Sequence, residues 1–146
     1  MESSYNLLSF QILNTKVIFN AQKTQGYNNV IGTLTYDKVD LNIGGGFDGS
    51  SGKFKVPISG IYRMSFSGQS ANKNTVTAIY VYKNGSPMFR IYDTNEVENS
   101  NAHNVSYTWM MTLVQGDELK LNSHHYLLAN SDERLTFTGE LIHIEN

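Results

Sequence analysis

The sequence predicts an all-β protein, built as an antiparallel β-sandwich of about ten strands. Three observations support this prediction. Apolar and polar residues alternate with a period of two in several short segments, which is the pattern of strands with one buried face. Glycine, Asn-Gly and proline separate these segments at short intervals, as turn residues do. No segment of ten or more residues has the apolar spacing of an amphipathic helix.

The expected strands of the N-terminal part begin with an apolar alternation over residues 8–12 and a second apolar segment over residues 16–20. Val39, Leu41 and Ile43 then alternate with polar residues. We therefore expect these three side chains on the buried face of one strand. A glycine-rich turn follows and ends that strand.

The middle of the chain continues the same pattern. Tyr62, Met64 and Phe66 alternate with polar residues and predict the buried face of another strand. Residues 76–82 are rich in β-branched and aromatic side chains and carry them on both faces. They lead into Asn84-Gly85, the strongest short-range signal of a β-hairpin.

The C-terminal part contains the clearest alternation, over residues 105–113. Gly116-Asp117 predicts a turn into a strand that contains Leu119 and Leu121. Residues 135–141 form the last expected strand. The whole chain, residues 1–146, is expected to be a single domain, because most domains hold about 100 to 150 residues.

The order of these segments resembles the globular C1q-like domain, a family named for subcomponent q of the first complement component. Each motif alone is weak, but six occur in family order and extend the resemblance over about residues 7–144. The motifs are NIG..FD (42–48), GKF..P (52–57), SGIY.MSF (59–66), YKNG (82–85), LVQGDEL (113–119) and FTGELI (137–142).

The resemblance implies a jelly roll, shared with the tumour necrosis factor ligands, and a homotrimer. It also implies a secreted protein, outside the cell or at its surface, whose leader is not among these residues. The expected function is non-enzymatic recognition, as in innate immunity or lectin-like binding, of a carbohydrate or protein ligand. The alternative is a structural, self-assembling trimerisation head of a collagen-like, spore-surface or extracellular-matrix protein. A Gly-X-Y tract before the domain would favour that alternative, and these residues contain none.

Composition excludes several other classes. The net charge is -2 and only 16% of residues are charged, so we expect no nucleic-acid partner, which would need clustered Lys and Arg. No apolar run approaches the roughly 20 residues that span a bilayer, so we expect no membrane insertion. The chain has no cysteine, which excludes disulfides, a thiol nucleophile and thiolate metal sites.

The histidines do not form a catalytic pattern. His124 and His125 are adjacent, so in an extended segment their side chains point to opposite faces, and we expect both in a loop before residue 135. His143 follows the last strand, and its simplest interpretation is a structural histidine. No spacing supports a zinc helix, a nucleophile elbow or a phosphate loop. We therefore expect no enzyme and no required cofactor.

One loop is a candidate calcium site, because carboxylate and amide oxygens in a flexible loop suit this ion. The residues are Asp93, Glu96, Glu98 and Asn101. Some C1q-like trimers bind calcium near the threefold axis through aspartates in this loop region. A solvated polar loop is the competing interpretation.

Loop residues at the ends of the sandwich are the expected ligand contacts, because Tyr and Asn combine stacking with hydrogen bonding at low entropic cost. The competing interpretation of each is an ordinary surface residue. The candidates are Tyr27, Asn28, Asn72, Lys73, Tyr92, His124, His125 and Tyr126.

Two neighbouring residues of the last strand also stand out. Gly139 would let a large side chain or another backbone come close. Glu140 stands where the family usually carries a bulky apolar residue. We expect it at a polar subunit interface or at a sheet edge.

Overall fold

The computed structural model describes residues 15–71, 76–93 and 104–145, and this part of the chain contains eleven strands. They are β1 (Ile18–Lys23), β2 (Tyr27–Thr33), β3 (Lys38–Ile43), β4 (Phe47–Asp48), β5 (Lys53–Lys55), β6 (Gly60–Ser70), β7 (Thr77–Lys83), β8 (Ser86–Asp93), β9 (Asn104–Leu113), β10 (Glu118–Ala129) and β11 (Leu135–Ile144). Within these ranges, no helix is long and apolar enough to cross a membrane.

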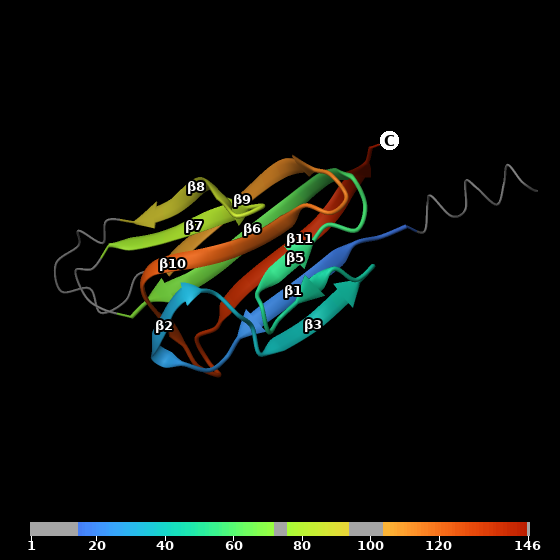
Figure 1. Cartoon of the computed structure of the whole chain (residues 1–146). Coiled ribbons are helices and arrows are strands. Elements are labelled where there is room, and N and C mark those ends of the chain that lie inside the picture. Colours follow the sequence, from blue (N-terminus) through green and yellow to red (C-terminus); the bar gives the residue numbers. More distant parts are fainter. Residues whose placement is uncertain (1–14, 72–75, 94–103, 146) are drawn as a thin grey trace, which may run out of the picture.

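The strands form two layers, and every pairing is antiparallel (Figure 1). One layer has the order β3-β1-β11-β6-β9. The other is centred on β10, with β7 and β8 on one side and β2 and β5 among its other partners. Leu127 and Leu128 of β10 pair with β6 and join the layers at one end. The predicted antiparallel β-sandwich is therefore confirmed.

The layers enclose a core rich in aromatic side chains. Phe19 of β1 stacks on Phe47 with ring centroids 4.5 Å apart, and it meets Phe137 of β11 edge-on at 5.1 Å. Tyr62, Met64 and Phe66 of β6 are fully buried, as their alternation predicted. Burying a large apolar side chain contributes about 1.5 to 3 kcal/mol, so these rows provide much of the driving force for folding.

The predicted buried face of β3 is wrong for two of its three residues. Leu41 and Ile43 are exposed, whereas Val39 packs against the core. The reason is a β-bulge: Asn20 pairs with Leu41 but Ala21 pairs with Val39, so Asp40 has no partner in the register. The extra residue reverses the alternation and turns the residues beyond it to the outer side.

The hairpin predicted at Asn84-Gly85 is confirmed. Both residues have positive φ, 54° and 81°, as the two central residues of a type I′ turn require. The Asn84 side chain also ties this turn to the β9–β10 turn, because it donates to Asp117 Oδ1 at 2.9 Å and accepts from the Glu118 N–H at 2.8 Å. The two turns therefore hold β7, β8 and β10 together at one end.

Asp117 is the buried centre of the β9–β10 turn, which confirms the predicted role in turn geometry. Its Oδ2 accepts the N–H of Val114 at 2.9 Å. Burial alone would raise the pKa of this carboxyl. The hydrogen bonds from Asn84 and Val114, with the positive charge of Lys83, outweigh burial and hold the pKa below its usual range.

Other predicted boundaries need correction. β1 begins at Ile18 and runs on to Lys23, beyond the expected segment 16–20. His124 and His125 lie inside β10 and not in a loop, since β10 continues to Ala129 with β2 as its partner. The alternation predicted over residues 8–12 lies outside the described residues.

Candidate functional site

All six predicted ligand contacts that the structure describes lie on strands, which corrects the expectation of loops. Tyr27 and Asn28 begin β2, Tyr92 lies in β8, and Tyr126 belongs to β10 with the two histidines. Polar residues in β10 resemble a loop in sequence, but pairing with neighbouring strands satisfies their backbone. The other two candidates, Asn72 and Lys73, lie outside the described residues.

The predicted calcium site is described only in part. Asp93 is the last residue of β8 and pairs with the buried Thr77 of β7. Glu96, Glu98 and Asn101 lie outside the described residues. In the part of the chain that the structure covers, no three His, Asp or Glu side chains gather as a metal site would require.

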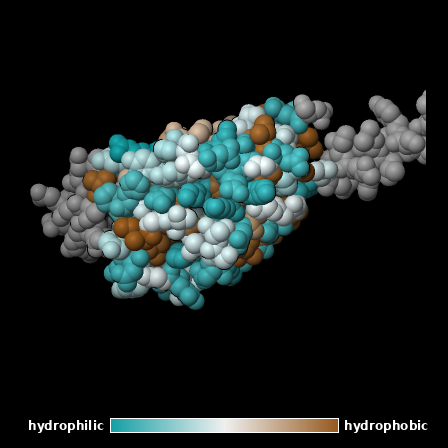
Figure 2. All heavy atoms as spheres, viewed as in Figure 1, coloured by the Kyte–Doolittle hydropathy of each residue, from teal (hydrophilic) through white to brown (hydrophobic). Residues whose placement is uncertain are grey.

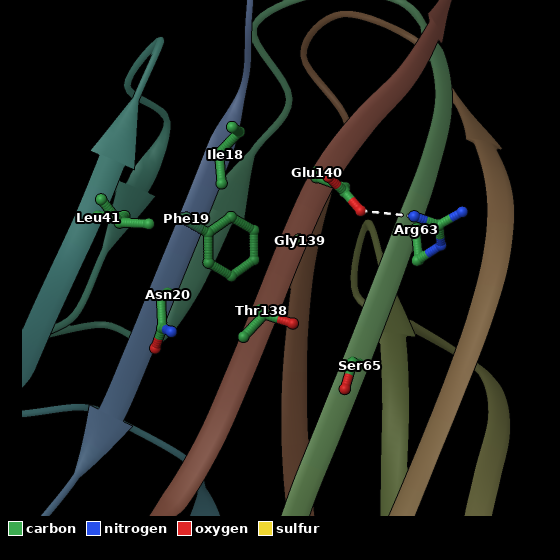
Figure 3. A pocket seen from close by; sticks show the side chains of 9 residues that line it. All are labelled: Ile18, Phe19, Asn20, Leu41, Arg63, Ser65, Thr138, Gly139 and Glu140. Atoms are coloured by element: carbon green, nitrogen blue, oxygen red, sulfur yellow. Dashed lines mark hydrogen bonds and ion pairs between the residues drawn. The ribbon is translucent and has the colours of Figure 1, made fainter.

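The first candidate surface is the outer side of the β3-β1-β11-β6 layer, which we call the hollow face (Figure 3). It contains a depression of about 210 Å³. Arg63 of β6 and Glu140 of β11 form an ion pair across it, with Nη1 and Oε1 2.7 Å apart. Because β11 lies between β1 and β6, the prediction that Glu140 sits at a sheet edge is wrong. The residues that line the depression are Ile18, Phe19, Asn20, Leu41, Arg63, Ser65, Thr138, Gly139 and Glu140.

Gly139 is among the residues that line the depression, but the side chain that it lacks would point into the core, because Gly139 pairs with the buried Phe19 and Met64. A Cβ at this position would overlap the ring of Phe19 and lie 3.0 Å from Cε of Met64. The prediction that a large neighbour approaches this glycine closely is therefore confirmed. Gly139 therefore makes room for the ring of Phe19 in the core, and Phe19 is also among the residues that line the outer depression.

The hollow face also carries exposed apolar residues, on the strands to either side of the ion pair. Met110 of β9 is 65% exposed and pairs with Arg63 in the register, so both side chains lie on this side. Leu41 and Ile43, turned outward by the bulge, are 44% and 46% exposed on the same side. This face therefore combines a neutralised charge pair with an apolar surround.

The second candidate surface is the side of the sandwich between β8 and β9, which we call the open seam. In the described part of the chain, β8 pairs only with β7 and β9 only with β6. Phe89 of β8 meets Trp109 and Tyr107 of β9 with ring centroids 5.3 and 5.9 Å apart. A wide depression of about 750 Å³ lies beside them, lined by residues 89–93 and 104–107. Aromatic packing holds the seam in place of a strand ladder.

The third candidate surface is the outer side of β8, β7 and β10, which we call the ring face. Tyr80 of β7 stacks on His124 of β10, with ring centroids 4.2 Å apart. The guanidinium carbon of Arg90 lies 4.2 Å from the ring centroid of Tyr92, and Nζ of Lys120 lies 5.4 Å from that of Tyr82. The ring face thus consists of Tyr80, Tyr82, Arg90, Tyr92, Lys120 and His124.

The ring face joins Tyr92 and His124, which were predicted, to four residues that sequence reasoning missed. The hairpin signal could have identified part of the ring face, because pairing across Asn84-Gly85 places Arg90 opposite Tyr80. The visible surface in Figure 2 is mostly teal and near-white, with separate brown patches in place of one continuous apolar area. Exposed aromatic rings bearing polar groups are typical of binding surfaces.

Curated proteins that are similar to this chain include complement C1q tumor necrosis factor-related proteins. The chain is 28% identical over 131 residues to human complement C1q tumor necrosis factor-related protein 3, covering 87% of this chain and 51% of that protein. It is 33% identical over 108 residues to human complement C1q tumor necrosis factor-related protein 2, covering 74% of this chain and 36% of that protein. The chain therefore spans about half or less of the length of these relatives.

Solved structures show the same fold. The globular domain of zebrafish complement 1qA protein matches with a TM-score of 0.70 and 17% identity, over 88% of this chain and 99% of that one. Murine APRIL matches with a TM-score of 0.69 and 12% identity, over 88% of this chain and all of that one. These likenesses confirm the predicted jelly roll.

A family model, described as the C1q domain, matches residues 17–142. The match covers the strands that form both layers, and it confirms the resemblance first drawn from six short motifs. The family is non-enzymatic, in agreement with the prediction that the chain is not an enzyme. The chain belongs to the C1q domain family.

Proposed function

We propose that this domain is a homotrimeric, non-enzymatic recognition module that works outside the cell or at its surface. One observation supports the assembly most directly: the sandwich exposes large apolar side chains on two unlike surfaces, the hollow face and the open seam. Exposed apolar patches on a folded domain mark interaction sites more often than isolated apolar residues do.

The difference between these two surfaces favours a closed, ring-shaped assembly of several copies of the domain. A contact that joins one surface to a different surface of the next copy is heterologous, and it closes into a ring when the rotation allows. The hollow face offers Leu41, Ile43 and Met110, whereas the open seam offers Tyr107, which is 49% exposed. In a trimer each copy would present its seam to the hollow face of the next. The fold-level likeness to trimeric domains agrees with this number of copies.

A trimer would present three copies of each ligand contact on one particle. Several weak contacts to a clustered carbohydrate or protein ligand then combine into a much tighter attachment. Recognition in innate defence is the setting that fits such a head.

The assembly is tested by light scattering coupled to size-exclusion chromatography. We expect a trimer for the unmodified chain and a monomer for Leu41→Asp, because the new charge would be buried without a partner. Ile31→Asp is the matched control, since Ile31 of β2 is also 44% exposed but lies in the other layer. A monomeric parent chain, or equal effects of both substitutions, would overturn the trimer.

Calcium binding at Asp93 is a second, separate proposal. Hard oxygen ligands at the end of β8 suit this ion, and Glu96, Glu98 and Asn101 would supply more. Titration calorimetry with calcium chloride should show binding that Asp93→Ala weakens at least tenfold. Unchanged calorimetric heats in that variant would remove Asp93 from the site.

A further inference from the structure

We propose that the ring face binds a sulfated oligosaccharide. This inference rests on the proposed recognition function and names its ligand class and its site. The charges of the ring face, the aromatic rings that hold them, their spacing and the polar residues beside them support this ligand class.

The basic side chains of the ring face have no carboxylate partners within the described residues. Ion pairs there join Lys38 to Asp40, Lys53 to Glu118 and Arg63 to Glu140. Arg90 and Lys120 instead contact tyrosine rings. Within the described residues, the ring face therefore keeps a local positive charge, although the whole chain has a net charge of -2. Such a surface favours an anionic ligand.

The tyrosine rings hold these cations in defined places. Arg90 lies over Tyr92 and Lys120 over Tyr82, and the ring quadrupole attracts both charges. His124 is fixed in turn by stacking on Tyr80. Side chains that are already ordered lose less entropy on binding than free ones, so the ring face is partly organised for a ligand.

The spacing of the cations calls for more than one anionic group. Arg90 pairs with Tyr80 across one strand boundary, and Lys120 pairs with Tyr82 across the next. Two strand spacings and one two-residue step separate the two backbones by roughly 12 Å. A ligand with a single anion would reach one cation at a time. A chain that carries several sulfates can engage both, and the planar fork of Arg90 suits paired oxygens.

Neutral polar groups beside the cations favour a saccharide. Asn122 of β10 lies between Tyr80 and Thr33 in the register, and its Nδ2 donates to Thr33 Oγ1 at 3.4 Å. Amide and hydroxyl groups next to phenol rings match the many hydroxyls of a sugar chain. A nucleic acid would require a larger cluster of cations to neutralise its phosphates.

The test measures binding of a fluorescent, heparin-type sulfated hexasaccharide by anisotropy at two salt concentrations. The variant R90Q/K120Q removes both cations, and K16Q/K55Q removes the same charge from exposed lysines outside the ring face. We expect at least a tenfold loss of affinity and a weaker salt dependence for R90Q/K120Q. We expect less than a twofold change for K16Q/K55Q.

Four outcomes would overturn the proposal. Equal binding of the desulfated hexasaccharide would exclude sulfate recognition. Equal binding of a monosialylated trisaccharide would exclude the need for several anions, and tighter binding of oligothymidine would assign the surface to nucleic acid. Equal losses in the two double variants would exclude the ring face as the site.

Light scattering on the same samples separates this proposal from the proposed assembly. A trimer that fails to bind the hexasaccharide would overturn only the ligand assignment. A monomer that binds it, and loses binding in R90Q/K120Q, would overturn only the trimer.

Discussion

The hollow face and the ring face are the outer sides of the two layers, and they differ in whether their charged side chains form ion pairs. On the hollow face, Arg63 and Glu140 neutralise each other at 2.7 Å within an apolar surround. On the ring face, Arg90 and Lys120 lie over aromatic rings and have no carboxylate partner in the described residues.

The difference shows how one sandwich can present two kinds of surface. A charge pair that is already complete leaves no lone charge when another protein surface covers it, which limits the desolvation cost. A cation held over a ring keeps its full charge and much of its exposure. The first arrangement suits contact with another copy of the chain, and the second suits an anionic ligand.

The largest effect on this comparison should come from adding a side chain at Gly139, on the core side of the layer that carries the hollow face. Gly139→Val would force side-chain atoms into Phe19 and Met64, so we expect a loss of about 2 to 3 kcal/mol in the free energy of unfolding. Urea denaturation measures it. Thr138→Val, one residue away, is the control and should change stability by less than about 0.5 kcal/mol. If Gly139→Val had the same urea midpoint as the parent protein, the packing of the Phe19 ring would not depend on this glycine.

A smaller effect should follow from loosening the turn that anchors the ring-face strands. Asp117→Ala removes the acceptor for Asn84 and Val114, and we expect a loss of about 1 to 3 kcal/mol at pH 7. The folded-state pKa of Asp117 is depressed, so its contribution is complete above the unfolded pKa and is lost as pH falls through the folded value. The gap between parent and variant should therefore narrow towards pH 3.

Thermal unfolding from pH 7 to pH 3 measures this gap. Asp132→Ala, at an exposed aspartate in the β10–β11 connection, is the control and should leave the midpoint nearly unchanged. A gap that widens on acidification would contradict the direction assigned to the pKa of Asp117.

The smallest effect should come from the ion pair of the hollow face. Both side chains are about half exposed in the isolated domain, so a double-mutant cycle with Arg63→Gln and Glu140→Gln should give a coupling below about 1 kcal/mol. The cycle is measured by urea denaturation at concentrations where light scattering shows a monomer. A coupling of several kcal/mol in that monomer would contradict the contrast between the two faces.

Sequence patterns predicted the parts of the molecule that depend on local chemistry. Alternation identified the buried row of β6, and Asn84-Gly85 identified the hairpin between β7 and β8. The close neighbour of Gly139 was expected from the missing side chain of the glycine. These features follow from backbone conformation and side-chain direction over a few residues.

The ring face could not be predicted in the same way. Tyr80 and His124 stack across strands that are 44 positions apart in the chain, and no local pattern fixes that register. The polar residues around His124 also favoured a loop, because backbone pairing with β2 and β7 is invisible in a single segment. The same limit applies to β3, where one unpaired residue decided which side chains face outward.

The unpaired residue Asp40 decides which residues of β3 are buried and which are exposed. Odd and even positions exchange their surroundings at the bulge, so Leu41 and Ile43 meet water while Val39 meets the core. Deleting Asp40 itself would restore an unbroken pairing and leave Leu41 opposite Asn20, so the same side chains would still face outward. In a lineage of such domains, an insertion or deletion in this edge strand would therefore exchange its buried and exposed side chains only where no bulge absorbs the change.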